Sequence, residues 1–548
     1  MLAASLFSRL IGRALPRAQA ARERLPNLQA LPILSSDALS SVAYATEASL
    51  GVLILAGSSA LKQSLPITLA IIALIVIVVL SYRQAISAYP NGGGSYVVAR
   101  ENLGRNVSLV AAAALLIDYT LTAAVSLMAG TQALSSLLPS LLPHELSLSL
   151  LLLALVGWAN LRGIREAGRI FAIPTYVFVV MILLLTLVGL TDLSFQHGWT
   201  PDPPPLEAAL QPLGLFLILR AFSSGCSAMT GIEAISTGVQ VFREPAARNA
   251  RVTLLVMGGL LAAMLLAVTG LGFMYGIAPD SQVTVLAQIG IRVFGSGSIL
   301  FWLLQLSTLL ILVLAANTAF AGFPLLAAML AEDRCLPPQM RWLGDRLVYQ
   351  NGIGVLLAVS ALIIWICHGD TTVAVNLYAL GVFTAFTLSQ LGLVLHWFRM
   401  RGPGWQGRMA LNALGALSTF VVLLVIIVSK FTEGAWSVVI ALPLVVWGLA
   451  LIRRRSREVL ALLAPDPRME PLFLEPKASL PRHHAIVWLG GFNQPSFEAV
   501  RYACSIADKV TAVMVLSDQH SVDKTTPSQP SPCRRWNRRN ARLQRTAG

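Results

Sequence analysis

Apolar stretches long enough to cross a lipid bilayer recur along most of the chain. A spanning helix needs about 20 mostly apolar residues, and twelve such segments can be placed between residues 38 and 452. They lie near 38–57, 65–82, 107–138, 146–161, 170–190, 213–242, 252–276, 298–330, 352–368, 371–397, 411–429 and 434–452. Only 12% of the 548 residues are charged, against 56% that are hydrophobic. The pattern predicts an all-α polytopic membrane protein with twelve transmembrane helices and excludes a string of soluble domains.

Basic residues are distributed unevenly between alternate connectors. Of the 24 Lys and Arg up to residue 452, 20 fall on one side, Lys62, Arg292 and Lys430 fall on the other, and Arg220 lies within a span. Cytoplasmic connectors carry the excess of Lys and Arg. We therefore expect a multi-pass protein of the inner (plasma) membrane with both termini cytoplasmic. The net charge of +14 then reflects topology, and no nucleic-acid partner is expected.

The chain divides into four predicted parts. A basic, amphipathic cytosolic N-terminus precedes the transporter domain of twelve spans. A short cytosolic α/β segment follows, with the order strand, helix, strand near 485–489, 495–508 and 510–516. The basic tail after it has a composition typical of disorder. The expected boundaries are 1–30, 31–455, 456–517 and 518–548.

Motifs for enzymatic chemistry are absent from the sequence. No hydrolytic triad, HExxH motif or ATP-binding glycine loop occurs, and the five cysteines are too far apart for a CxxC metal site. We therefore expect no enzyme activity and no cofactor. Any transport must draw on an ion gradient.

Two spans break the rules for helices in lipid. Small and polar residues fill Ser35–Tyr44 in the first span, and Ser223–Glu233 in the sixth adds glycines. Unwound backbone at membrane depth is tolerated only inside protein or beside a water-filled cavity. Broken helices at corresponding places in two halves indicate a transport site. Close helix packing is the alternative, but packing needs neither Asp37 nor Glu233.

Acidic residues within the spans are the second sign of function, because a charge at mid-bilayer costs at least about 2.5 kcal/mol. Asp37 shares a helical face with Tyr44, and Asp118 shares one with Thr122, beside Tyr119. Carboxylate, hydroxyl and phenol oxygens suit a cation that sheds water. A protonatable acid could carry a proton instead. Two structural alternatives stay open: Asp37 as a helix N-cap, and Glu233 as the partner of Arg220.

Several motifs resemble a known family. The resemblance covers about residues 30–517 and is to the amino acid–polyamine–organocation (APC) superfamily, in particular to its KimA-like potassium importers. The motifs are Leu34–Tyr44 (LSSDALSSVAY), Tyr89–Gly104 (YPNGGGSYVVARENLG), Ile117–Thr122 (IDYTLT), Thr230–Gly238 (TGIEAISTG) and Phe242–Pro245 (FREP).

The resemblance implies a LeuT-like fold, with a five-plus-five inverted repeat and two further helices, and proton-coupled potassium uptake by alternating access. By motif position it implies potassium-site residues Asp37, Asp118, Thr122 and Thr230, joined in substrate binding by Tyr44, Tyr119 and Tyr378. Tyr378 rests on its span position alone. Glu233, together with Asp118, is implied as a proton-coupling acid.

The substrate and the regulation stay open at this point. A proton-coupled amino acid permease on the same fold is the alternative function, and a membrane sensor is the third, disfavoured by the paired breaks. In relatives, a longer C-terminal α/β domain supports homodimerisation and inhibition by cyclic di-AMP. Here the α/β pattern stops near Ser517 and looks truncated, which puts cyclic di-AMP regulation in doubt.

Overall fold

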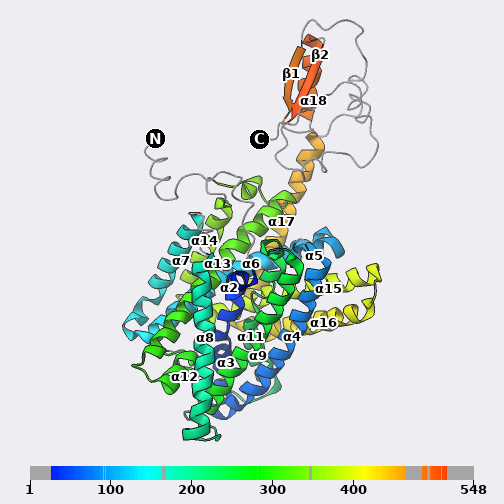
Figure 1. Ribbon diagram of the computed structural model, residues 1–548. Helices are drawn as coiled ribbons and strands as arrows, with labels where there is room; N and C mark the ends of the chain where they lie inside the picture. Colours follow the sequence, from blue (N-terminus) through cyan, green and yellow to red (C-terminus); the bar gives the residue numbers. More distant parts are fainter. Residues whose placement is uncertain are drawn as a thin grey trace. The chain divides into compact units, whose positions relative to one another are not determined.

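The computed structural model describes residues 26–90, 92, 94–162, 168–280, 282–344, 348–463, 484–489, 494–507 and 509–514 (Figure 1). Two compact units divide the chain, Met1–Ala450 and Leu451–Gly548. The predicted basic tail and nearly all of the predicted amphipathic N-terminus lie outside the described residues; 27–30 open the first helix.

The first unit is helical throughout its described elements. Its α-helices are α2 (Asn27–Ser40), α3 (Val42–Leu53), α4 (Ser64–Ala88), α5 (Ser95–Asn102), α6 (Arg105–Leu137), α7 (Glu145–Leu161), α8 (Gly168–Asp192), α9 (Leu215–Gly225), α10 (Ala234–Thr237), α11 (Ala246–Met274), α12 (Val285–Phe294), α13 (Ile299–Glu332), α14 (Gln350–Ile366), α15 (Thr371–Met400), α16 (Trp405–Lys430) and α17 (Ala435–Leu463), the last of which crosses the unit boundary. Short turns join them: η2 (Ile54–Ala56), η3 (Ser58–Gln63), η4 (Pro139–His144), η5 (Leu193–His197), η6 (Cys226–Met229), η7 (Val239–Val241), η8 (Pro338–Arg341) and η9 (Phe431–Glu433).

Every predicted span coincides with a helix. Among the described residues, eleven helical segments are long and apolar enough to cross a membrane. The remaining predicted segment, 352–368, corresponds to α14, which has 17 residues. The predicted start of the first span at residue 38 is wrong, because α2 already begins at Asn27. Its first two turns include Gln29 and Pro32, which lowered the apparent hydrophobicity of that stretch.

Both predicted helix breaks are present. Between α2 and α3 the helix is interrupted at Ser41, and the hydroxyls of Ser40 and Ser41 donate to the carbonyl oxygens of Asp37 (2.9 Å) and Ala38 (2.6 Å). Such local bonds compete with the helical ladder. In the sixth span, α9 gives way to η6, Thr230 is extended, and Gly231 has a φ of +75°. A positive φ is readily adopted by glycine, so Gly231 lets the chain turn there.

The connector after α4 contains a short helix. A turn precedes this helix, α5, which sequence reasoning did not predict. Gly104, with a φ of +90°, separates α5 from α6. The turn and the short helix together bring Ser95, the first residue of α5, to the inside of the bundle, where it is fully buried.

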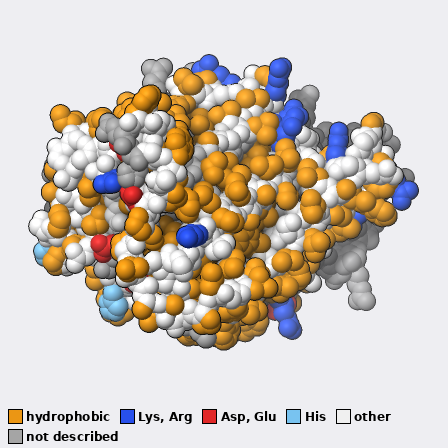
Figure 2. Space-filling model, turned by 90° about the horizontal axis from the view of Figure 1, so that it is seen from below, with side chains coloured by type: hydrophobic (Ala, Val, Ile, Leu, Met, Phe, Trp, Pro, Cys, Tyr) orange, Lys and Arg blue, Asp and Glu red, His pale blue; other side chains and the backbone are white. Residues whose placement is uncertain are grey.

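The centre of the helical unit is built from α6, α13 and α15, which pack on α2 and α16. Small side chains on α6, such as Ala112, Ala113 and Ala123, are fully buried and allow close helix approach. The face of the molecule seen in Figure 2 is mostly hydrophobic, with few charged groups. Exposed apolar side chains recur along the long helices, as a bilayer-facing surface requires.

The second unit contains the predicted β-α-β segment. Strand β1 (His484–Leu489) pairs in parallel with β2 (Lys509–Met514), and helix α18 (Gln494–Ile506) connects them. The register runs from His484 opposite Lys509 to Leu489 opposite Met514. The predicted order of strand, helix and strand is confirmed, with boundaries that differ by one or two residues.

Candidate functional site

The two broken spans lie against each other at their breaks. Ser41 of the first span donates a hydrogen bond to the carbonyl oxygen of Ala228 in the sixth (3.0 Å). Three residues further along, the hydroxyl groups of Tyr44 and Thr230 are 3.5 Å apart. The irregular segments therefore pair with each other inside the protein, where their backbone is shielded from lipid.

Asp37 occupies the centre of this contact. It is 5% exposed and lies inside α2, so the alternative role of a helix N-cap is wrong. Gly231 packs so tightly on it that a Cβ atom there would stand 2.7 Å from Asp37 Oδ2. The break in the sixth span thus leaves room for a carboxylate on the first span.

A tyrosine from a distant span completes the oxygen cluster. Tyr378 of α15 is fully buried, and its hydroxyl forms a 2.8 Å hydrogen bond with the hydroxyl of Thr122 on α6. The same phenol interacts with Asp37 and with Tyr44. The structure therefore brings together Asp37, Tyr44, Thr122, Thr230 and Tyr378, all but one of which were expected from local motifs.

Asp118 interacts both with this cluster and with Glu233. It is 7% exposed on α6, and its carboxylate interacts electrostatically with Asp37 and with Glu233. Each of these three acids has one buried carboxylate oxygen with no hydrogen-bond partner among the described residues: Asp37 Oδ1, Asp118 Oδ1 and Glu233 Oε1. Buried polar atoms are nearly always paired, so these three oxygens are available to a cation or a proton.

Glu233 is held by residues that the sequence did not single out. Its Oε2 accepts hydrogen bonds from Ser95 (2.5 Å) and from the hydroxyl of Tyr82 (3.1 Å). Arg220 pairs with Glu433 instead, so the alternative in which Glu233 is the partner of Arg220 is wrong. No local signal marks Tyr82 or Glu433, whereas Ser95 stands in the glycine-rich motif and could have been suspected.

An inner cavity of about 110 Å³ reaches Glu233 from the side of the basic connectors. Tyr119 lines it, with its ring against Gly322 of α13. Tyr119 therefore belongs with Glu233, and no direct contact between it and Tyr44 or Thr230 is recorded among the described residues.

Hydrogen bonds at Tyr96 fix the wall of this cavity. Its phenol donates to Asp333 Oδ2 (2.6 Å), which also accepts from Arg100 (2.6 Å). Burial, and then the Asp333 carboxylate, raise the pKa of Tyr96 above its ordinary value, so the phenol keeps its proton and remains a donor. Through Ser95 and Tyr96, the short helix α5 thus contacts both Glu233 and the end of α13.

An outer vestibule of about 510 Å³ reaches the cluster from the other side, at Tyr44. Arg220 and His368 are the basic groups that line it, and Arg220 is already paired with Glu433. Its acidic lining residues among those described are Glu47, Glu145, Asp280, Asp370 and Glu433. The vestibule is therefore acidic on balance, as suits the approach of a cation.

The oxygen cluster is not a cage for a transition metal. Among the described residues, no three of His, Cys, Asp and Glu stand close enough together to hold a metal ion. The cluster instead combines single carboxylates with neutral hydroxyl and phenol oxygens, all of which are hard ligands.

Broken helices that meet inside a bundle, with a polar cluster between two cavities, define a membrane transporter. Residues 33–450 match the amino acid permease family, and the chain belongs to that family. The chain is therefore a transporter and not an enzyme. Over 519 residues it is 41% identical to the potassium transporter KimA of Bacillus subtilis (strain 168), a match that covers 94% of this chain and 84% of the relative.

Proposed function

We propose that the chain imports potassium together with protons by alternating access, across the plasma membrane and with both termini in the cytoplasm. The observation that carries the proposal is the pair of buried aspartates. Asp37 and Asp118 each present an oxygen without a hydrogen-bond partner among the described residues. Two neighbouring buried carboxylates repel each other unless a cation or a proton is bound.

The chemistry of the surrounding ligands favours potassium. Thr122, Thr230, Tyr44 and Tyr378 supply neutral oxygens around the acids. A large monovalent cation gives up its water for such dipoles more readily than a small divalent ion does. The similarity to a potassium transporter of Bacillus subtilis supports the same assignment.

The position of Glu233 supports a role for protons. It interacts with Asp118 from the side of the inner cavity. One of its oxygens is bonded to Ser95 and Tyr82, and the other has no hydrogen-bond partner among the described residues. We assign proton coupling to Glu233 and Asp118, because a proton on either acid changes the charge next to the cation site.

Alternating access is supported by the two separate approaches to the cluster. The outer vestibule ends at Tyr44, and the inner cavity ends at Glu233 and Tyr119. Tyr44 of the first broken span lies against Thr230 of the sixth, so a small movement of one span against the other would open one approach and close the other.

The test is rubidium uptake into proteoliposomes with an inward proton gradient, with and without a protonophore. Accumulation that collapses with the protonophore supports the proposal. Accumulation that follows the membrane potential and ignores the proton gradient would overturn proton coupling alone. Vesicles that hold folded protein but accumulate a radiolabelled amino acid, and no rubidium, would overturn the potassium assignment.

A further inference from the structure

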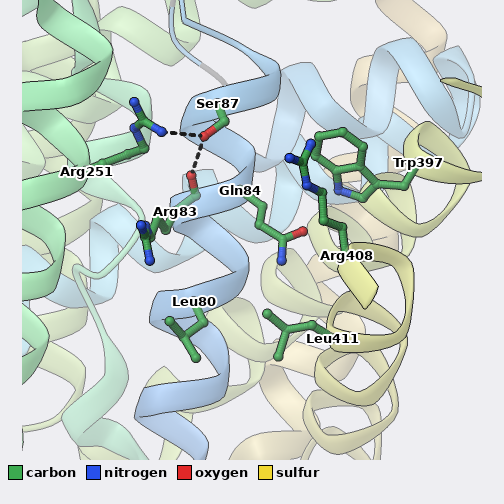
Figure 3. A pocket seen from close by; sticks show the side chains of 8 residues that line it. All are labelled: Leu80, Arg83, Gln84, Ser87, Arg251, Trp397, Arg408 and Leu411. Carbon is green, nitrogen blue, oxygen red and sulfur yellow. Dashed lines mark hydrogen bonds between the residues drawn. The ribbon is translucent and has the colours of Figure 1, made fainter. Parts of the chain in front are cut away.

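A second pocket, of about 380 Å³, lies away from the transport site, at the ends of four helices (Figure 3). Its lining includes Leu80 and Arg83 from α4, Arg251 from α11, Trp397 from α15, and Arg408 and Leu411 from α16. Helix α4 packs on both α11 and α16, so it carries the middle of the pocket. All of these helix ends belong to the side of the basic connectors.

Three arginines give the pocket a strong positive charge. No ion pair is recorded between Arg83, Arg251 or Arg408 and any acid in the part of the chain that the structure describes. Arg251 donates to the Ser87 hydroxyl at 3.3 Å, and Arg408 stacks 4.7 Å above the ring of Trp397. The lining contains no acidic side chain, so the arginines are left to bind an anion.

A buried donor faces the same space. Trp397 is only 7% exposed, and its indole N–H has no hydrogen-bond partner among the described residues. An unpaired buried donor costs roughly 1–3 kcal/mol, so its position against the pocket indicates an absent acceptor. Figure 3 shows the indole nitrogen directed toward the side chains of Arg408 and Gln84.

The floor of the pocket is fixed by hydrogen bonds. Gln84 accepts from the Asn412 side chain (2.7 Å) through its carbonyl oxygen, so its NH2 group can serve the pocket. Asn412 is fully buried, and its own oxygen accepts from Ser81 (2.5 Å). Gln84 is therefore held in place at the base of the pocket, beside the exposed side chains of Arg83 and Arg408.

The helices that carry the arginines continue into an apolar surface. Beyond Arg408, α16 exposes Leu414 (51%) and Leu417 (61%), and beyond Arg251, α11 exposes Leu255 (38%) and Val256 (45%). Leu80 and Leu411 line the pocket itself. A ligand in the pocket can thus have an anionic end among the arginines and an apolar end along α11 or α16.

We propose that this pocket binds the phosphate headgroup of an anionic phospholipid, with its acyl chains along the exposed faces of α11 and α16. Arginine forks match phosphate oxygens, and basic pockets between transmembrane helices on the cytoplasmic side are suited to anionic lipid headgroups. The apolar surface next to the arginines favours a lipid over a free phosphate ion.

The test compares lipid retention by purified protein in native mass spectrometry, with phosphatidylglycerol or phosphatidylcholine added to the detergent. We expect the wild-type protein to retain phosphatidylglycerol preferentially. Arg83→Gln combined with Arg408→Gln should reduce that retention about tenfold or more, at roughly 1 kcal/mol for each arginine. Trp397→Phe, which keeps an aromatic ring but removes the indole N–H, should weaken retention about threefold, by the loss of one hydrogen-bond donor.

The matched control is Arg248→Gln combined with Arg401→Gln. Both arginines are exposed on the same side and do not line the pocket, so this variant should retain the lipid as the wild type does. Equal losses in the control and the pocket variant would overturn the proposal in favour of general surface attraction. Displacement of the lipid by millimolar inorganic phosphate would overturn it in favour of a free anion site. If the pocket double variant fails to fold, Trp397→Phe alone decides, and wild-type retention by that folded variant would overturn the proposal.

Discussion

Asp37 and Gly231 touch across the two broken spans, with no space for a side chain at the glycine. A Cβ atom on Gly231 would lie 2.7 Å from both Asp37 Oδ2 and the backbone nitrogen of Ala38. The glycine also has a φ of +75°, a conformation that costs other residues about 1–2 kcal/mol. The contact explains why residue 231, between Thr230 and Glu233, is a glycine.

Gly231→Ala should therefore lose most rubidium uptake, by about tenfold or more, because the new methyl group must push Asp37 out of the cluster. The control is Gly259→Ala on α11, where a Cβ atom would meet nothing within 4 Å. Uptake in proteoliposomes with equal amounts of folded protein measures both. Normal uptake by the Gly231 variant would show that the position of Asp37 does not matter for transport.

Asp118→Asn should abolish rubidium uptake with expression retained. The substitution keeps the shape of the side chain but removes the charge that interacts with Asp37 and Glu233. Glu332→Gln, which neutralises an exposed acid at the end of α13, should transport as the wild type does. The assay is rubidium uptake in cells that lack other potassium importers. Rubidium uptake at the wild-type rate by the Asp118 variant would contradict the role assigned to this residue.

Tyr378→Phe should weaken cation binding more than it weakens folding. It removes one hydroxyl that bonds Thr122 at 2.8 Å, worth about 1 kcal/mol in stability. Tyr176→Phe is matched, since it removes a hydroxyl bonded to the carbonyl oxygen of Leu28 at 2.7 Å, away from the cluster. We expect an increase of several-fold in the KM for rubidium for the Tyr378 variant and none for the Tyr176 variant. Equal KM values would assign Tyr378 to packing alone.

The spans and their breaks were predictable because both follow from local composition. Runs of apolar residues mark a bilayer helix wherever they occur, and Ser35–Tyr44 and Ser223–Glu233 are too small and polar to be ordinary spans. The start of α2 at Asn27 was not predictable in the same way. Helix α2, which includes residues 27–34, packs on α8 and α13, and a hydropathy pattern does not register such packing.

The pairing of side chains across the bundle was harder to predict from the sequence. Asp37, Asp118 and Glu233 stand out because an acid in a span is costly wherever it packs. The partners of Glu233, which are Ser95 and Tyr82, are ordinary residues in their local sequence, and only the folded chain brings them within 3.1 Å. Arg220 shows the same limit, since its partner Glu433 lies more than two hundred residues away.

Lys430 provides a prediction about stability. It is fully buried at the end of α16, and its ammonium nitrogen has no hydrogen-bond partner among the described residues. It interacts electrostatically with the thiol of Cys226 and with Arg220, which carries a charge of the same sign. A buried cation without a partner costs several kcal/mol, and an apolar residue of similar length often stabilises the fold.

Lys430→Met should accordingly raise the apparent melting temperature of the detergent-solubilised protein, by roughly 1 °C for each kcal/mol gained, because the shift becomes smaller as the chain becomes longer. The control is Lys62→Met. Lys62 is exposed, and the sequence predicts that it lies on the same side of the membrane as Lys430. Its replacement should leave the melting temperature unchanged. A lower melting temperature for the Lys430 variant would mean that the ammonium group has a stabilising partner. A higher melting temperature together with a loss of rubidium uptake would mean that the buried charge serves transport at the expense of stability. Such a role would fit the position of Lys430, which interacts with the thiol of Cys226 where the sixth span leaves its helix.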